Sequence, residues 1–198
     1  MESLANGYER IATEFLARRG KAGSSGGVGT AHVRAWAQTL APGAEVLDLG
    51  CGSGWPITKV LVDAGLRVSA VDASPTLVAA FRHNFPAIPV ACEPVEASTF
   101  FGGMFDAALA WGLWFLLPVA VQRELPRRLA AILRPGGRLL MTAPAQALTW
   151  LDAMTGEESR SLGADTYRAL LKEAGFLVAR EYEDEGANHY YDAIRGGT

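Results

Sequence analysis

Two hydrophobic patterns alternate along most of this chain. Short continuous apolar runs predict buried strands, and stretches with apolar residues three or four positions apart predict helices. Strands are expected at 44–49, 67–72, 88–92, 105–111 and 134–144, and helices at 55–65, 74–85, 119–133 and 164–175. Ser74 is expected to cap the second of these helices, with Pro75 in its first turn. Strands that alternate with helices in this way predict a largely parallel sheet covered on both faces.

The last part of the chain has a different pattern. Two further strands are expected at 176–184 and 188–195, separated only by the short turn "EGAN". A turn this tight cannot make a parallel crossover, so these two strands must be antiparallel.

The first forty residues lie outside the alternation. Leu4, Tyr8, Ile11 and Phe15 recur at helical spacing and predict an amphipathic helix over about the first eighteen residues. The glycine- and serine-rich stretch 20–29 is predicted to be flexible, and a second helix is expected from Thr30 to about residue 40. We therefore expect one domain over 1–198, with 1–40 as a helical lid and 41–198 as the core.

Composition narrows the function. With 198 residues, 49% hydrophobic and 20% charged residues and a net charge of −3, the chain is typical of a globular protein and lacks the basic character of nucleic-acid binders. Cys51 and Cys92 have neither CxxC spacing nor a histidine cluster nearby, which favours free thiols and no metal site. No apolar run reaches the length of a membrane span, and the N-terminus lacks a signal-peptide pattern. A cytoplasmic protein without a membrane or nucleic-acid partner is expected.

The stretch "VLDLGCGSGWP" carries the clearest chemical signal. Gly50, Gly52 and Gly54 stand at every second position between an expected strand and an expected helix, and Asp48 precedes them. A dinucleotide-binding turn needs a small residue at the sixth position of its fingerprint, where this chain has Trp55. The pattern therefore disfavours a nicotinamide or flavin dinucleotide.

"DLGCGSG" resembles the cofactor motif of the class I S-adenosylmethionine-dependent methyltransferases. Three further stretches resemble that family's later motifs in the same order: "VDAS" at 71–74, "FDAALAWGLWFLLP" at 105–118 and "LRPGGRLLMTAP" at 133–144. The resemblance covers about residues 44–195. It implies a three-layer α/β/α Rossmann-like fold, whose seven-stranded sheet is mostly parallel with an antiparallel last strand. It also implies S-adenosylmethionine (SAM) as cofactor and S-adenosylhomocysteine (SAH) as product.

The resemblance also implies which residues bind the cofactor. Asp48 and the Gly50 carbonyl would meet the ammonium group, and Asp72 would accept both ribose hydroxyls. Asp72 could instead be an acid favoured by the N-terminus of the following helix. Either Glu93 or Glu96 could read the adenine edge. The predicted cofactor-binding residues are Asp48, Gly50, Cys51, Gly52, Gly54, Asp72, Ala73, Glu93, Val95, Glu96, Ala110 and Trp111.

The acceptor is expected to be a small molecule. The D/N-P-P-Y/F stretch of base-methylating relatives is replaced here by "WGLWF", and neither cysteine follows a proline. The predicted substrate-binding residues are Trp111, Trp114, Phe115, His189 and Tyr191, and the predicted catalytic residues are His189, as a base, and Tyr8, as a closing residue. Core packing is the alternative interpretation for each aromatic, and a packed or exposed hairpin residue for His189.

The function expected from these residues is methyl transfer from SAM to a nitrogen, sulfur or oxygen atom of a small aromatic or cationic metabolite, by a monomer or homodimer. Two alternatives stay open at this point. The chain could bind SAM as a sensor without catalysis, or it could methylate a macromolecule.

Overall fold

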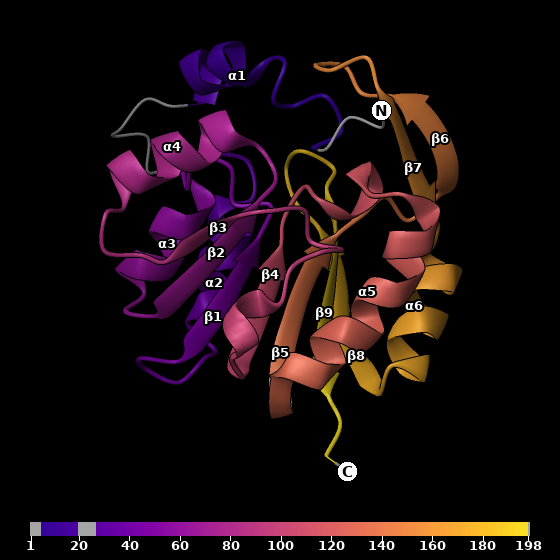
Figure 1. Cartoon of the computed structure of the whole chain (residues 1–198). Helices are drawn as coiled ribbons and strands as arrows, with labels where there is room; N and C mark the ends of the chain where they lie inside the picture. Colours follow the sequence, from indigo (N-terminus) through magenta and orange to yellow (C-terminus); the bar gives the residue numbers. More distant parts are fainter. Residues whose placement is uncertain (1–4, 20–26, 198) are drawn as a thin grey trace.

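Seven strands form one sheet in the order β3-β2-β1-β4-β5-β9-β8 (Figure 1). The computed structural model describes residues 5–19 and 27–197. Only β9 runs antiparallel to its neighbours, which confirms the predicted mostly parallel sheet with an antiparallel last strand. The strands are β1 (Glu45–Leu49), β2 (Arg67–Asp72), β3 (Val90–Cys92), β4 (Phe105–Ala110), β5 (Leu133–Thr142), β8 (Phe176–Glu183) and β9 (His189–Arg195).

Helices cover both faces of this sheet because its strands are apolar on both sides. On β1, Val46 packs in a cluster with α2 and α3, whereas Leu47 and Leu49 pack in a cluster with α5 and α6. α4 adds a smaller aromatic cluster against Ala70 of β2. The helices are α2 (Thr30–Ala37), α3 (Ile57–Asp63), α4 (Pro75–Asn84), α5 (Val119–Ile132) and α6 (Ala164–Glu173).

A two-stranded hairpin that the sequence analysis did not anticipate stands between β5 and α6. It consists of β6 (Ala147–Leu151) and β7 (Glu158–Leu162), and Figure 1 shows it beyond the carboxyl end of β5. The buried amide of Gln122 on α5 fixes the hairpin, donating to the Arg160 carbonyl at 2.9 Å and accepting from the Tyr167 hydroxyl at 2.7 Å. The hairpin is thereby tied to α5 and α6 and held near the carboxyl edge of the sheet.

The N-terminal region differs from the expected lid. Residues 5–11 form turns, and the first helix, α1 (Ala12–Arg19), begins later than predicted; it lies over the carboxyl edge beside α4 (Figure 1). α2 belongs to the core, because Val33 and Trp36 are buried against the sheet. Most of the predicted flexible stretch, residues 20–26, lies outside the described residues. Only the segment before residue 20 is therefore placed over the site.

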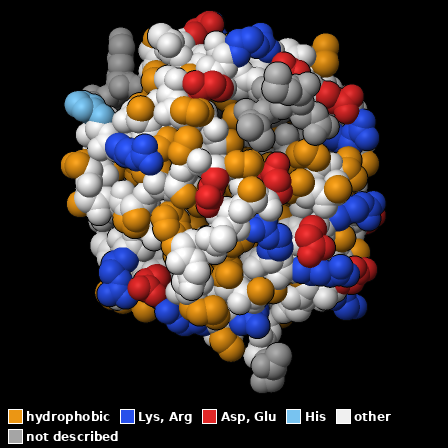
Figure 2. Space-filling model, in the orientation of Figure 1, with side chains coloured by type: hydrophobic (Ala, Val, Ile, Leu, Met, Phe, Trp, Pro, Cys, Tyr) orange, Lys and Arg blue, Asp and Glu red, His pale blue; other side chains and the backbone are white. Residues whose placement is uncertain are grey.

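The surface carries no strongly basic region on the face in Figure 2. Lys and Arg side chains of the described residues are intermixed there with Asp and Glu. Within 5–19 and 27–197 no helix is long and apolar enough to cross a membrane.

Candidate active site

A cavity of about 750 Å³ opens at the carboxyl edge of the sheet. The turns after β1, β2, β3 and β4 form one side, and the β6–β7 hairpin and residues 5–8 form the other. Ligands of open parallel sheets bind at this edge, where the strand order changes direction between β1 and β4.

The glycine turn after β1 forms the cavity floor. Gly50, Cys51 and Gly52 line the cavity, and all three glycines of the turn have positive φ. Gly54 serves packing instead of the predicted cofactor contact: a Cβ there would lie 2.4 Å from the Phe85 ring, and Gly54 does not line the cavity. The first two glycines therefore shape the cavity, and the third allows close approach of α4's end.

Asp48 is a buried carboxylate at the cavity wall. The Thr58 hydroxyl donates to its Oδ2 at 2.6 Å, and no Lys or Arg of the described residues forms an ion pair with it. Burial raises the pKa of Asp48 to about 7, with Thr58 opposing the shift and Asp72 adding to it. A buried carboxylate without a cation partner is costly, so this position suits a ligand's ammonium group.

Asp72 ends β2 and braces the glycine turn. Its Oδ2 accepts from the Gly52 N–H and its Oδ1 from the Ser74 N–H, both at 2.8 Å. Burial raises its pKa, opposed by these two hydrogen bonds. Ser74, as predicted, caps α4 by accepting from the Leu77 N–H, so Asp72 is not the cap. Each Asp72 oxygen keeps a second lone pair, which fits a ribose diol in the adjoining cavity.

The loop after β3 brings one of the two predicted acids to the cavity. Val95 and Glu96 line the cavity, as does Ala73 from the preceding turn, whereas Glu93 does not. Of the two predicted acids, Glu96 therefore lies at the cavity and Glu93 lies outside it.

The aromatic residues after β4 divide between cavity and core. Trp111 and Phe115 line the cavity, and Trp150 of β6 packs on Phe115 with ring centroids 5.4 Å apart. Trp114 is fully buried in the core, because the 3₁₀ turn at 114–116 directs its indole inward. The predicted cavity position of Trp114 is corrected accordingly.

Three other predicted residues also lie away from the cavity. His189 pairs with Glu181 at 2.9 Å and with Glu183 at 3.4 Å, and its ring packs on Tyr191. Tyr191 is fully buried against Tyr167 on the α6 side of the sheet, and Ala110 is fully buried in β4. None of these residues lines the cavity, and no histidine does so among the described residues. A base at His189 has no access to an acceptor bound there.

The cavity is covered by a strap, residues 5–10, that spans its two sides. Tyr8 lines the cavity as predicted and donates to Asp152 of the hairpin at 3.4 Å. Arg10 donates to the Thr155 carbonyl at 2.7 Å and to Glu157 at 3.0 Å. On the other side, Glu9 accepts hydrogen bonds from Ser74 and Thr76 at the start of α4. The strap therefore joins the cofactor end of the cavity to the hairpin.

The hairpin brings charged residues to the cavity that were not predicted from the sequence. The cavity is lined by six carboxylates and one guanidinium of the described residues: Asp48, Asp72, Glu96, Asp152, Glu157, Glu158 and Arg160. The turn-forming sequence "DAMTGE" was a signal for this hairpin. No cluster of three metal-ligating side chains occurs in the described part of the chain. The lining is strongly acidic and suits cationic ligands.

A family model described as a methyltransferase domain matches residues 46–137, which include the glycine turn, Asp72 and β4. These residues match that methyltransferase family, and the whole chain has the class I, Rossmann-like methyltransferase fold. Among curated relatives of this protein, an uncharacterised methyltransferase of Mycobacterium tuberculosis is 37% identical over 95 residues, 48% of this chain and 37% of the relative. A ubiquinone biosynthesis O-methyltransferase of Xanthomonas campestris is 31% identical over 111 residues, 54% of this chain and 45% of that enzyme. The matches thus span less than half of these relatives' own length.

Solved structures share the whole fold with this protein. The [4+2]-cyclase SpnF superimposes with a TM-score of 0.79 at 16% identity, covering 100% of this chain and 96% of SpnF. A second structure is the 1,6-didemethyltoxoflavin-N1-methyltransferase of Burkholderia thailandensis, solved with 1,6-didemethyltoxoflavin and SAH. It superimposes with a TM-score of 0.72 at 21% identity, covering 94% of this chain and 88% of that chain. Because one of these proteins is titled a cyclase, the fold alone does not define the reaction.

Proposed function

We propose that this protein transfers the methyl group of SAM to a nitrogen, sulfur or oxygen atom of a small aromatic or cationic molecule. One observation carries the proposal: one cavity is lined by the buried carboxylate of Asp48, the half-buried carboxylate of Asp72 and the aromatic side chains of Trp111 and Phe115. Its volume of about 750 Å³ falls within the range of small-molecule sites, roughly 300–1,000 Å³.

The cofactor end offers a partner for each part of SAM. Asp48 would hold the ammonium group and Asp72 the ribose hydroxyls, while Val95 and Glu96 would contact the adenine. SAM supplies a methyl group already activated by its sulfonium. The chain's own residues then have to align the acceptor and exclude water.

The acceptor end supports an aromatic or cationic molecule. Aromatic faces attract cations and stack on planar rings, and the hairpin adds Asp152, Glu157 and Glu158 to the lining. Because no histidine lines the cavity among the described residues, a nucleophile that attacks without first losing a proton, such as an aromatic nitrogen or a thiolate, fits better than an alcohol. The acidic lining and the covering strap disfavour a nucleic acid.

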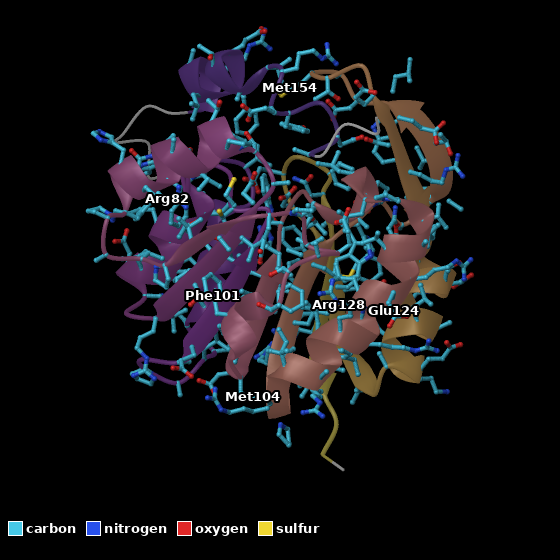
Figure 3. All side chains as sticks on the ribbon, viewed as in Figure 1. Arg82, Phe101, Met104, Glu124, Arg128 and Met154 are labelled. Carbon is cyan, nitrogen blue, oxygen red and sulfur yellow. The ribbon has the colours of Figure 1, made fainter. Side chains whose placement is uncertain are left out.

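The test is transfer of an isotope-labelled methyl group from SAM to matched heteroaromatic amines, thiols, phenols, RNA, DNA and protein. We expect label in a small-molecule product, and turnover reduced at least tenfold in Phe115→Ala. Phe101→Ala is the control, because Phe101 is exposed and lies outside the cavity (Figure 3). Labelled polymer with inert small molecules would contradict the proposal, and SAM binding without any transfer would favour a sensor.

A further inference from the structure

A hydrogen-bond chain runs behind the cavity wall at Trp111. The Trp111 indole Nε1 donates to the Tyr190 hydroxyl at 2.7 Å, and this hydroxyl donates to Asp184 Oδ2 at 2.8 Å. Trp111 lines the cavity, Tyr190 is fully buried in β9, and Asp184 lies in the turn between β8 and β9. These two hydrogen bonds therefore link a wall of the cavity to a buried carboxylate outside the cavity.

Asp184 carries the negative charge at the end of this chain. Its Oδ1 accepts from the backbone N–H groups of Gly186 and Asn188 at 2.9 and 3.0 Å, and the Asn188 amide also donates to it. Burial opposes ionisation, but the hydrogen bonds from Asn188, Tyr190 and Gly186 outweigh it and lower the pKa. Asp184 forms no ion pair with a Lys or Arg of the described residues, so its charge acts on Tyr190 without a competing cation.

Packed groups shield the Trp111–Tyr190–Asp184 hydrogen bonds from water. The Tyr190 ring stacks on Tyr182 with centroids 4.9 Å apart and an interplanar angle of 11°. Gly29, just before α2, covers the Trp111–Tyr190 hydrogen bond: a Cβ there would lie 2.5 Å from the Tyr190 hydroxyl and 2.6 Å from the indole nitrogen. Since Gly29 also has a φ of 79°, only glycine suits this position.

Trp111 stands beside the glycine turn. Asp48 of β1 pairs with Leu109 of β4, and Gly50 and Trp111 each follow two residues later, at the same edge of the sheet. A cofactor that occupies the glycine turn thus lies next to this indole. Successive hydrogen bonds polarise one another, and donation toward a carboxylate increases the electron density of the indole ring. A more electron-rich face attracts a cation more strongly.

We propose that Tyr190 and Asp184 are positioning residues for methyl transfer, which fix the Trp111 indole at the cavity wall and strengthen its attraction for the sulfonium of SAM. This inference rests on the proposed function, because it requires SAM beside the glycine turn. SAH is the natural reference ligand, since its sulfur is an uncharged thioether.

The first measurement uses the protein without ligand. The indole N–H resonance of Trp111, assigned with Trp111→Phe, should move upfield in Tyr190→Phe, because the acceptor of its hydrogen bond is lost. Asp184→Asn should move it less, since the hydroxyl remains. Tyr182→Phe is the matched control: Tyr182 stacks on the same ring but is outside the hydrogen-bond chain. An unmoved resonance in Tyr190→Phe would overturn the inference.

The second measurement is the ratio of SAM to SAH affinity by calorimetry, with thermal unfolding to confirm that each variant folds. We expect Tyr190→Phe to lower this ratio by about three- to tenfold, within the range of a cation–π contact. Asp184→Asn should fall between wild type and Tyr190→Phe, and Tyr182→Phe should keep the wild-type ratio. An unchanged ratio in Tyr190→Phe with normal SAM binding would overturn this inference and leave the proposed function intact. Wild-type protein that binds neither ligand would overturn both.

Discussion

At the scale of single residues, burial of the Asp48 carboxylate is the main free-energy cost in this site. It is buried beside a second acid, Asp72, which further raises its pKa. Groups with strongly shifted pKa values cluster at functional sites, because a bound ligand can offset the free energy that their burial costs. Under the proposed function, the ammonium group of SAM would be this compensating group.

The cost of Asp48 predicts how stability depends on pH. The pKa of Asp48 is about 7 in the folded protein and 3.8 in the unfolded chain. Its contribution to the stability of the fold is therefore fully present below about pH 4 and is lost as the pH rises through 7. Asp48→Asn stays neutral and can still accept from Thr58. Without ligand, the free energy of unfolding of Asp48→Asn relative to that of wild type should therefore rise by about 2–4 kcal/mol between pH 5 and pH 8.

Thermal unfolding of both proteins across this pH range measures the effect. Asp63→Asn is the control, because Asp63 is an exposed acid on α3 that pairs with Lys59. Parallel curves for wild type and Asp48→Asn would show that Asp48 is already ionised and compensated in the free protein.

The sequence allowed a cavity residue to be predicted where the end of a strand determines its position. It did not where the direction of the side chain determines whether the residue reaches the cavity. Asp48, Asp72 and Trp111 line the cavity because each lies at or near the carboxyl end of a predicted strand. Tyr191 was predicted to bind substrate, but it and its neighbour Tyr190 point to opposite faces of β9, and neither lines the cavity. Nothing in "NHYYD" distinguishes those faces.

At the scale of elements, the buried strands and the helices that cover them were predictable, because continuous apolar runs bounded by glycine and proline define them. The β6–β7 hairpin was not. Four of the five β6 residues are exposed, so their sequence lacks a hydrophobic period, and the hairpin is held by the buried Gln122 side chain of another element. Only the turn-forming stretch "DAMTGE" marks this part of the proposed acceptor site in the sequence.

The loop after β3 depends on a helix distant in sequence. Arg128 projects from α5, near Glu124 (Figure 3), and donates to the backbone carbonyls of Val95 and Ser98; its guanidinium lies 4.7 Å from the Phe100 ring centroid. These contacts fix the loop that carries Val95 and Glu96 into the cavity.

Arg128→Met should therefore weaken SAH binding by about 1–2 kcal/mol, as expected for lost charged hydrogen bonds. It should also reduce the preference for SAH over its inosine analogue, because the loop would no longer read the adenine edge. Arg127→Met is the matched control, since Arg127 is exposed and pairs only weakly, with Glu124 and Glu173. Equal binding and equal preference in both variants would contradict this role.

At the scale of the whole molecule, the site is made by joining two parts. The sheet edge provides the carboxylates and Trp111, and the hairpin and strap cover them from the other side. The strap contacts both parts, so SAM and an acceptor would be enclosed together. In this arrangement the core would hold SAM, and the hairpin and strap would determine which acceptor fits.

The central claim is that this cavity binds SAM through Asp72, and calorimetric titration with SAH tests it most directly. Asp72→Ala should weaken SAH binding by about 2–3 kcal/mol, as for lost hydrogen bonds to a charged group. Glu93→Ala, which alters a neighbouring acid outside the cavity, should bind SAH like wild type. If Asp72→Ala remains folded and binds SAH as tightly as wild type, the assignment of this cavity to SAM is contradicted.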